Sequence, residues 1–181
     1  FLESWFLGGI MNKPIIMVVE DNKTTQETLK RDLEPLDLDV LIAPSAEDAW
    51  VLLESGHVPD VLILDFYLPG EDGPTFFRRL HSDPRFKNLA VIPFTALIER
   101  QDRSSHSKVS NFVSARKSEA KNIHTIISKQ GQEDIAKTPE DLIIEIGRAL
   151  DHKDVPLPEA FRTERKKCLE IKVQKMKTEG S

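Results

Sequence analysis

Three short apolar runs, separated by amphipathic stretches, constrain the fold of this chain most strongly. The runs are IIMVV at 15–19, VLIL at 61–64 and AVIPF at 90–94. Each has the length of a strand and no polar face, which is typical of strands covered on both sides in a parallel sheet. The shorter run DVLIA at 39–43 fits another strand, and HTIIS at 124–128 is the best candidate for a fifth.

Helical patterns fill the segments between these runs. Apolar residues recur at spacings of three and four over about 23–34, 46–55 and 74–82. TPEDLIIEIGRAL at 138–150 predicts a capped amphipathic helix after the last run. Strands that alternate with helices predict an α/β protein with right-handed crossovers.

The chain has 181 residues, which suits one domain with appendages. We expect an N-terminal extension over 1–12, the domain over 13–150 and a basic C-terminal tail, helical in part, over 151–181. Within the domain, the polar region 98–122 is predicted to be a lengthened loop with a helix around 106–121. A disordered insertion is the alternative for that region.

Composition excludes several classes of protein. With 25 basic and 30 acidic residues the net charge is -5, which gives no overall attraction to nucleic acid or to an anionic membrane. Cys168 is the only cysteine, so no intramolecular disulfide forms, and a reducing, cytoplasmic location is expected. The apolar first ten residues are too short for a membrane span, and Met11 is expected to be the natural start.

The tail is strongly basic. Residues 161–177 carry a net charge of +5 against about -10 for the rest. We interpret the tail as a solvated helix or frayed linker, with docking to a partner or packing on the acidic domain as the alternative. The apolar residues that would line one helical stripe are Phe161, Cys168, Leu169, Val173 and Met176.

Polar residues follow each predicted strand at its carboxyl end. Glu20 and Asp21 follow the first run, Asp65 follows VLIL, Thr95 follows AVIPF and Lys129 follows TIIS. In an open parallel sheet, ligands bind beyond the carboxyl ends of the strands. Three carboxylates, a hydroxyl and an ammonium group are therefore expected to converge.

This combination predicts phosphoryl chemistry. Neighbouring carboxylates repel one another unless a cation neutralises them, and oxygen ligands suit Mg²⁺. An ionised Asp65 needs no general base to attack phosphorus. The Thr95 hydroxyl and the Lys129 ammonium group can contact the oxygens of the transferred group.

Four separated motifs carry a resemblance to a known family. VVEDN, VLILDFYLPGEDG, FTA and ISK, in this order, resemble the receiver domain of two-component response regulators over about residues 13–150. The resemblance implies a doubly wound, flavodoxin-like sheet of five parallel strands in the order 2-1-3-4-5, with helices on both faces.

The resemblance also implies roles for particular residues. A histidine kinase or a small phosphodonor would phosphorylate Asp65, with Glu20 and Asp21 as the acidic pair for Mg²⁺. The backbone carbonyl of Tyr67 would complete the protein ligands of the ion. Thr95 would move toward the phosphoryl group, and Lys129 would pair with it.

The chain departs from the family pattern around the lysine. Gln130 replaces the usual proline, and Thr95 and Lys129 are 34 positions apart, which is long for the family. Lys137 is the competing candidate, but HTIIS predicts a strand before Lys129. Pro93 is expected to kink the fourth strand.

Two further side chains are expected to control how long the phosphoryl group persists. Tyr67 and Leu97 each lie two positions after a site residue, where the family modulates access of water. Bulky or apolar groups there would exclude the hydrolytic water. We therefore expect slow self-dephosphorylation.

The leading interpretation is a stand-alone receiver that signals through phosphorylation-dependent protein contacts and is not an enzyme. Its expected partners are a histidine kinase or phosphotransfer protein, an unidentified downstream protein and a second copy in a homodimer, without nucleic acid or membrane. One alternative is a receiver-like binding module that does not switch. Another is an aspartate-nucleophile phosphatase, which Tyr67 disfavours because such enzymes carry a second aspartate at that position.

Overall fold

The computed structural model describes residues 12–94 and 139–179 of the chain. Four parallel strands form one sheet in the order β2-β1-β3-β4. They are β1 (Ile15–Val19), β2 (Asp39–Ala43), β3 (Val61–Leu64) and β4 (Ala90–Pro93). This α/β sheet and this strand order confirm the predicted fold for the described residues. The strand predicted at 124–128 lies outside them.

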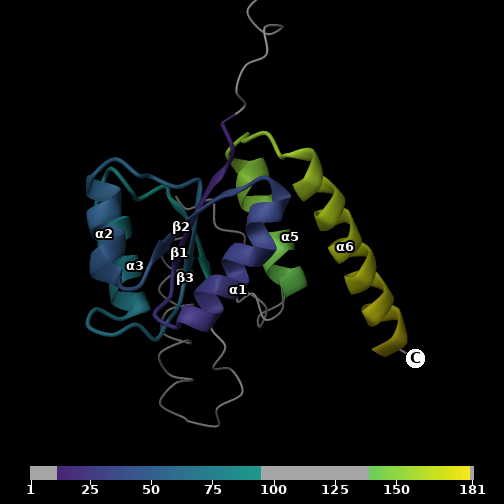
Figure 1. Ribbon diagram of the computed structural model, residues 1–181, viewed down its shortest axis with the longest axis horizontal. Coiled ribbons are helices and arrows are strands. Elements are labelled where there is room, and N and C mark those ends of the chain that lie inside the picture. The colour runs from purple at the N-terminus through teal and green to yellow at the C-terminus, as the bar shows by residue number, and fades with distance from the viewer. Residues whose placement is uncertain (1–11, 95–138, 180–181) are drawn as a thin grey trace, which may run out of the picture.

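Helices cover both faces of the sheet (Figure 1). On one face lie α2 (Ala46–Glu54) and α3 (Gly73–Ser82). On the other lie α1 (Lys23–Leu33), which continues into the short 3₁₀ helix η1 (Glu34–Leu36), and α5 (Pro139–His152). The last helix, α6 (Glu159–Glu179), lies alongside α5. The helix predicted around 106–121 lies outside the described residues.

The strands are apolar throughout because each face of the sheet has its own core. Ile16 and Val18 of β1 face the core under α1 and α5, whereas Met17 and Val19 face the core under α2 and α3. All four side chains are fully buried. Burial on both faces explains the lack of alternation in the apolar runs.

Three helices begin at a polar residue that caps the first turn. Asn22 accepts a hydrogen bond from the Thr25 amide at 3.1 Å, and Ser45 accepts one from the Asp48 amide at 3.1 Å. Asp72 caps α3 in the same way, with a 2.9 Å bond from the Thr75 amide. These caps set where each helix starts after its strand.

Pro93 ends β4 without interrupting it. The register between β3 and β4 is continuous from Val61 and Ala90 to Leu64 and Pro93, so the expected kink is absent. The Phe94 amide donates to the Leu64 carbonyl at 2.8 Å. Because successive residues of a strand point their amides to opposite sides, the missing N–H of Pro93 faces away from β3 and costs no bond to it.

The basic tail forms α6 and packs on the domain, so its interpretation as a frayed linker is wrong, although most residues of this helix are exposed to solvent. Phe161 and Cys168 lie in the core shared with α1 and α5. Arg165 forms an ion pair with Asp151 at 2.7 Å, and Lys172 forms one with Asp141 of α5 at 2.8 Å.

The apolar stripe expected on the tail is only partly buried. Phe161 and Cys168 are buried. The other expected members of the stripe are exposed: Leu169, Val173 and Met176. Within the described residues, no helix is long and apolar enough to cross a membrane.

Candidate functional site

Three carboxylates meet at the carboxyl ends of β1 and β3, which are neighbours in the sheet. Glu20 and Asp21 follow β1, and Asp65 follows β3. One carboxylate oxygen from each residue lies within 4.8 Å of the others. The structure thus brings together the three acidic residues that the strand-end argument singled out.

Backbone hydrogen bonds hold two of these residues in place. The Glu20 amide donates to the Ala43 carbonyl of β2 at 3.1 Å, and the Asp65 amide donates to the Val19 carbonyl of β1 at 2.9 Å. Each bond extends the ladder of the sheet one residue beyond the strand. The sheet therefore fixes the backbone from which the Glu20 and Asp65 side chains extend.

Glu20 is the most buried of the three carboxylates. Glu20 is 6% exposed, and its Oε1 accepts a hydrogen bond from the Asn22 amide at 3.1 Å. Burial raises the pKa of Glu20 to about 7, and the charge of Asp65 adds to this effect, while the Asn22 bond opposes it. The site therefore favours either a proton on Glu20 or a neutralising cation.

The cluster has the chemistry of a Mg²⁺ site. Its donors are carboxylate oxygens from three residues, which hard divalent cations prefer. Glu20 is buried, Asp65 is partly exposed and Asp21 is exposed, so one side of the cluster opens to solvent. A Mg²⁺ ion bound there could keep water ligands, as this ion usually does.

The loop after Asp65 folds closely against the start of α3. The Gly73 amide donates to the Phe66 carbonyl at 3.2 Å. A Cβ atom at Gly73 would collide with the backbone carbonyl of Asp65, so glycine is required there. Tyr67 is half-buried in this loop, and its buried hydroxyl has no hydrogen-bond partner among the described residues. Its carbonyl remains only a predicted ligand.

Four residues singled out from the sequence lie outside the described residues. They are Thr95, Leu97, Lys129 and Lys137. Their roles, including the choice between the two lysines, remain predictions.

An ion pair that holds the loop was not predicted from the sequence. Arg79 of α3 donates from Nη1 to Glu71 Oε2 at 2.8 Å. Eight positions separate the two residues across the end of the loop. This spacing matches no regular contact within a helix or strand, so no periodic pattern could reveal it.

Comparison with known proteins identifies the family. A family model described as the response regulator receiver domain matches residues 16–138. The chain belongs to the response regulator receiver family. This family accounts for the parallel sheet and for the position of the acidic cluster at its carboxyl edge.

Three curated relatives share this part of the chain. Identity is 36% over 90 residues with the phosphate regulon transcriptional regulatory protein PhoB of Rhizobium meliloti, covering 50% of this chain and 39% of PhoB. Identity is 35% over 88 residues with the response regulator Rre1 of Synechocystis sp., covering 48% of this chain and 38% of Rre1. Identity is 33% over 81 residues with the chemotaxis protein CheY1 of Helicobacter pylori, covering 44% of this chain and 65% of CheY1. The matched region is less than two thirds of each relative.

Solved structures show the same fold. A response regulator receiver domain protein from Clostridium thermocellum matches with a TM-score of 0.56 and 25% identity, covering 78% of this chain and 97% of that one. The signal receiver domain of an HD domain-containing protein from Pseudomonas fluorescens matches with a TM-score of 0.56 and 24% identity, covering 80% of this chain and 99% of that one.

Proposed function

We propose that this receiver is a phosphorylation switch that accepts a phosphoryl group on Asp65 in a Mg²⁺-dependent reaction. The observation that carries the proposal is the meeting of Glu20, Asp21 and Asp65, whose carboxylate oxygens lie within 4.8 Å of one another. The donor would be a histidine kinase or a phosphotransfer protein, and small phosphodonors would replace it in vitro.

In this proposal Asp65 is the nucleophile. A carboxylate oxygen of Asp65 forms the new bond to phosphorus while the bond from phosphorus to the donor nitrogen breaks, and no proton has to leave the nucleophile. Glu20 and Asp21 hold the ion beside Asp65, with the Tyr67 carbonyl as a further ligand. Mg²⁺, when bound, would neutralise the carboxylates and contact the oxygens of the phosphoryl group.

Thr95 and Lys129 complete the proposal at the phosphoryl group. A hydroxyl and an ammonium group beside it would stabilise its negative charge after transfer. Their contacts would differ between the two states of Asp65. Such differential contacts are what shifts an equilibrium between two arrangements of a protein.

The output of the switch would be contact with another protein. Phosphorylation would favour one of two surface arrangements, and the downstream partner would bind that arrangement better. Asp65 would be phosphorylated, and water would later hydrolyse the aspartyl phosphate to restore Asp65 and release inorganic phosphate, without turnover of a separate substrate. Tyr67 supports this assignment, because a phosphatase with an aspartate nucleophile needs an acidic residue where Tyr67 stands.

Intact-mass measurement tests the proposal. The protein is incubated with acetyl phosphate and Mg²⁺ and compared with Asp65→Asn and with a sample containing a chelator. The expected result is a gain of one phosphoryl group in the wild-type protein alone. No gain with either acetyl phosphate or a panel of histidine kinases, in a folded protein, would favour a receiver-like binding module that does not switch.

A further inference from the structure

The loop that follows Asp65 is tied to both helices on its side of the sheet. Glu71, near the end of the loop, accepts a hydrogen bond and ion pair from Arg79 of α3 at 2.8 Å. Its backbone amide donates to Glu47 Oε1 of α2 at 3.2 Å. The Glu71 side chain is 16% exposed, so this ion pair is better shielded than most surface pairs.

Arg79 is itself held by an aromatic residue of α2. Its guanidinium carbon lies 3.8 Å from the centroid of the Trp50 ring, which is the geometry of a cation–π contact. Trp50 in turn packs edge-to-face against Phe86, with ring centroids 5.6 Å apart. A planar guanidinium held between a carboxylate and an aromatic face has little freedom to move.

The two ends of the loop are therefore fixed by different contacts. At the start, the Phe66 carbonyl accepts the Gly73 amide at 3.2 Å. At the end, Glu71 is held by Arg79 and Glu47. Tyr67 lies between these anchors, directly after Phe66. The direction of its carbonyl depends on the loop conformation that the anchors allow.

We propose that the Glu71–Arg79 ion pair, backed by Trp50, positions the Tyr67 backbone for the metal site. This inference rests on the proposed function, in which the Tyr67 carbonyl joins the three carboxylates around Mg²⁺. Glu71 and Arg79 are positioning residues, since they act through the loop backbone and contribute no ligand. Loss of a residue that orients a metal ligand typically lowers metal affinity about 10- to 100-fold.

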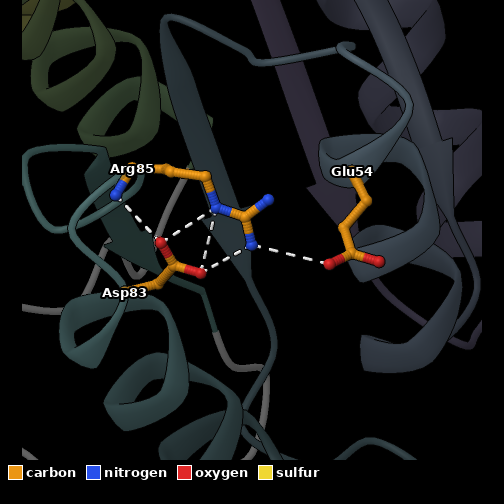
Figure 2. A network of polar contacts seen from close by, with 3 residues as sticks. All are labelled: Glu54, Asp83 and Arg85. Atoms are coloured by element: carbon orange, nitrogen blue, oxygen red, sulfur yellow. Dashed lines mark hydrogen bonds and ion pairs between the residues drawn. The ribbon is translucent and has the colours of Figure 1, made fainter.

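A neighbouring ion-pair network offers a matched control. Arg85 lies between Asp83, at 2.7 Å, and Glu54 of α2, at 3.5 Å (Figure 2). It approaches the same Trp50 ring, at 5.9 Å from the centroid. Within the described residues, none of the hydrogen bonds of this network reaches the loop at 66–72. Glu54→Gln thus removes a similar charge from the same face without freeing the loop.

The test measures binding of Mn²⁺, from the electron paramagnetic resonance signal of the free ion, with Mg²⁺ as competitor. The expected result is about tenfold weaker binding in Glu71→Gln and Arg79→Gln, with Glu54→Gln at the wild-type value. Arg79→Lys, which keeps the charge but not the planar stacking, should lie between. Melting temperatures without metal separate loss of fold from loss of affinity.

Two results would overturn the inference. Wild-type affinity in a folded Glu71→Gln would show that the loop needs no such anchor, and equal weakening in Glu54→Gln would show a general effect of charge. In both cases phosphorylation of the wild-type protein would leave the proposed function standing. If the wild-type protein bound neither ion, the proposed function and this inference would both fail.

Discussion

The backbone carbonyl of Asp65 occupies the space that a side chain at position 73 would need. Gly73 is the first residue of α3, and its amide also donates to the Phe66 carbonyl at 3.2 Å. The start of the helix and the proposed phosphoacceptor are therefore packed backbone against backbone. Neither can shift without moving the other.

Gly73→Ala should disturb the site as well as the fold. Because the obstacle is a backbone atom, the loop or helix must move, and we expect a loss of about 1–3 kcal/mol in the free energy of unfolding. Phosphorylation by acetyl phosphate should slow in the same variant. Thr75→Ala, which alters an exposed side chain in the same helical turn, is the control. If Gly73→Ala kept the wild-type free energy of unfolding and the wild-type rate of phosphorylation, the packing described would be contradicted.

Phe161 should make α6 an integral part of the domain. Its side chain is fully buried in the core with α1 and α5, so Phe161→Ala should lower the free energy of unfolding by about 3–5 kcal/mol. Met176→Ala, at a position 67% exposed on the same helix, should change it by less than about 0.5 kcal/mol. Urea denaturation of both variants measures this difference. Similar small effects would mean that α6 does not dock in solution.

Gly147 should allow α6 to approach α5. A Cβ atom at this position would lie 2.5 Å from Cδ and Nε of Arg165, whose guanidinium pairs with Asp151 at 2.7 Å. Gly147→Ala should therefore lower the free energy of unfolding more in the wild-type protein than in the Arg165→Ala variant, which lacks the obstructing side chain. A double-mutant cycle on urea denaturation measures the coupling, expected at about 0.5–3 kcal/mol. Additive effects would show that the two helices do not pack in this way.

The stability of the metal-free protein should fall as pH rises toward 7. The pKa of Glu20 is raised from 4.5 to about 7 by burial and by Asp65, so folding favours the protonated form. That stabilisation is complete below pH 4.5 and is lost as pH rises through about 7. Mg²⁺ should have the opposite trend, stabilising the protein more at higher pH, because it binds the ionised carboxylate.

Thermal melts across this pH range, with and without Mg²⁺, check the effect of Glu20. Glu20→Gln cannot ionise at this position, so its metal-free melting temperature should fall less with pH than that of the wild type. Its stabilisation by Mg²⁺ should also be smaller. Parallel pH profiles for the two proteins would assign the pH dependence to other groups.

The phosphoryl group on Asp65 should be lost slowly. Tyr67 is half-buried two positions from Asp65 and packs against the core under α2 and α3, where it can exclude water. Tyr67→Asn should shorten the lifetime of the phosphorylated protein, followed by intact mass after removal of the phosphodonor. Decay within seconds in the wild type, unchanged by the substitution, would refute this role.

The strands and the acidic cluster were predictable because local pattern and general geometry agree. Apolar runs such as 61–64 have no polar face, and parallel strands bring the residues that follow them to one edge. Glu20, Asp21 and Asp65 could therefore be placed together without coordinates. The high pKa of Glu20 could not be predicted, since it depends on how deeply the side chain is buried.

The docking of α6 was not predictable from the same kind of pattern. Only Phe161 and Cys168 of the expected stripe are buried, and the residues between them are half-buried or exposed. Arg165 and Lys172 contact Asp151 and Asp141, and these partners are defined only by the tertiary fold. Ion pairs of this kind leave no periodic signal in the sequence.

The most direct measurement locates the phosphoryl group on the chain. The protein is incubated with acetyl phosphate, with or without Mg²⁺, reduced with borohydride and digested for peptide sequencing by mass spectrometry. Reduction converts a phosphorylated aspartate to homoserine. We predict homoserine at position 65 only in the sample with Mg²⁺. An unchanged Asp65, or modification at Asp21 in its place, would contradict the assignment of Asp65 as the phosphoacceptor.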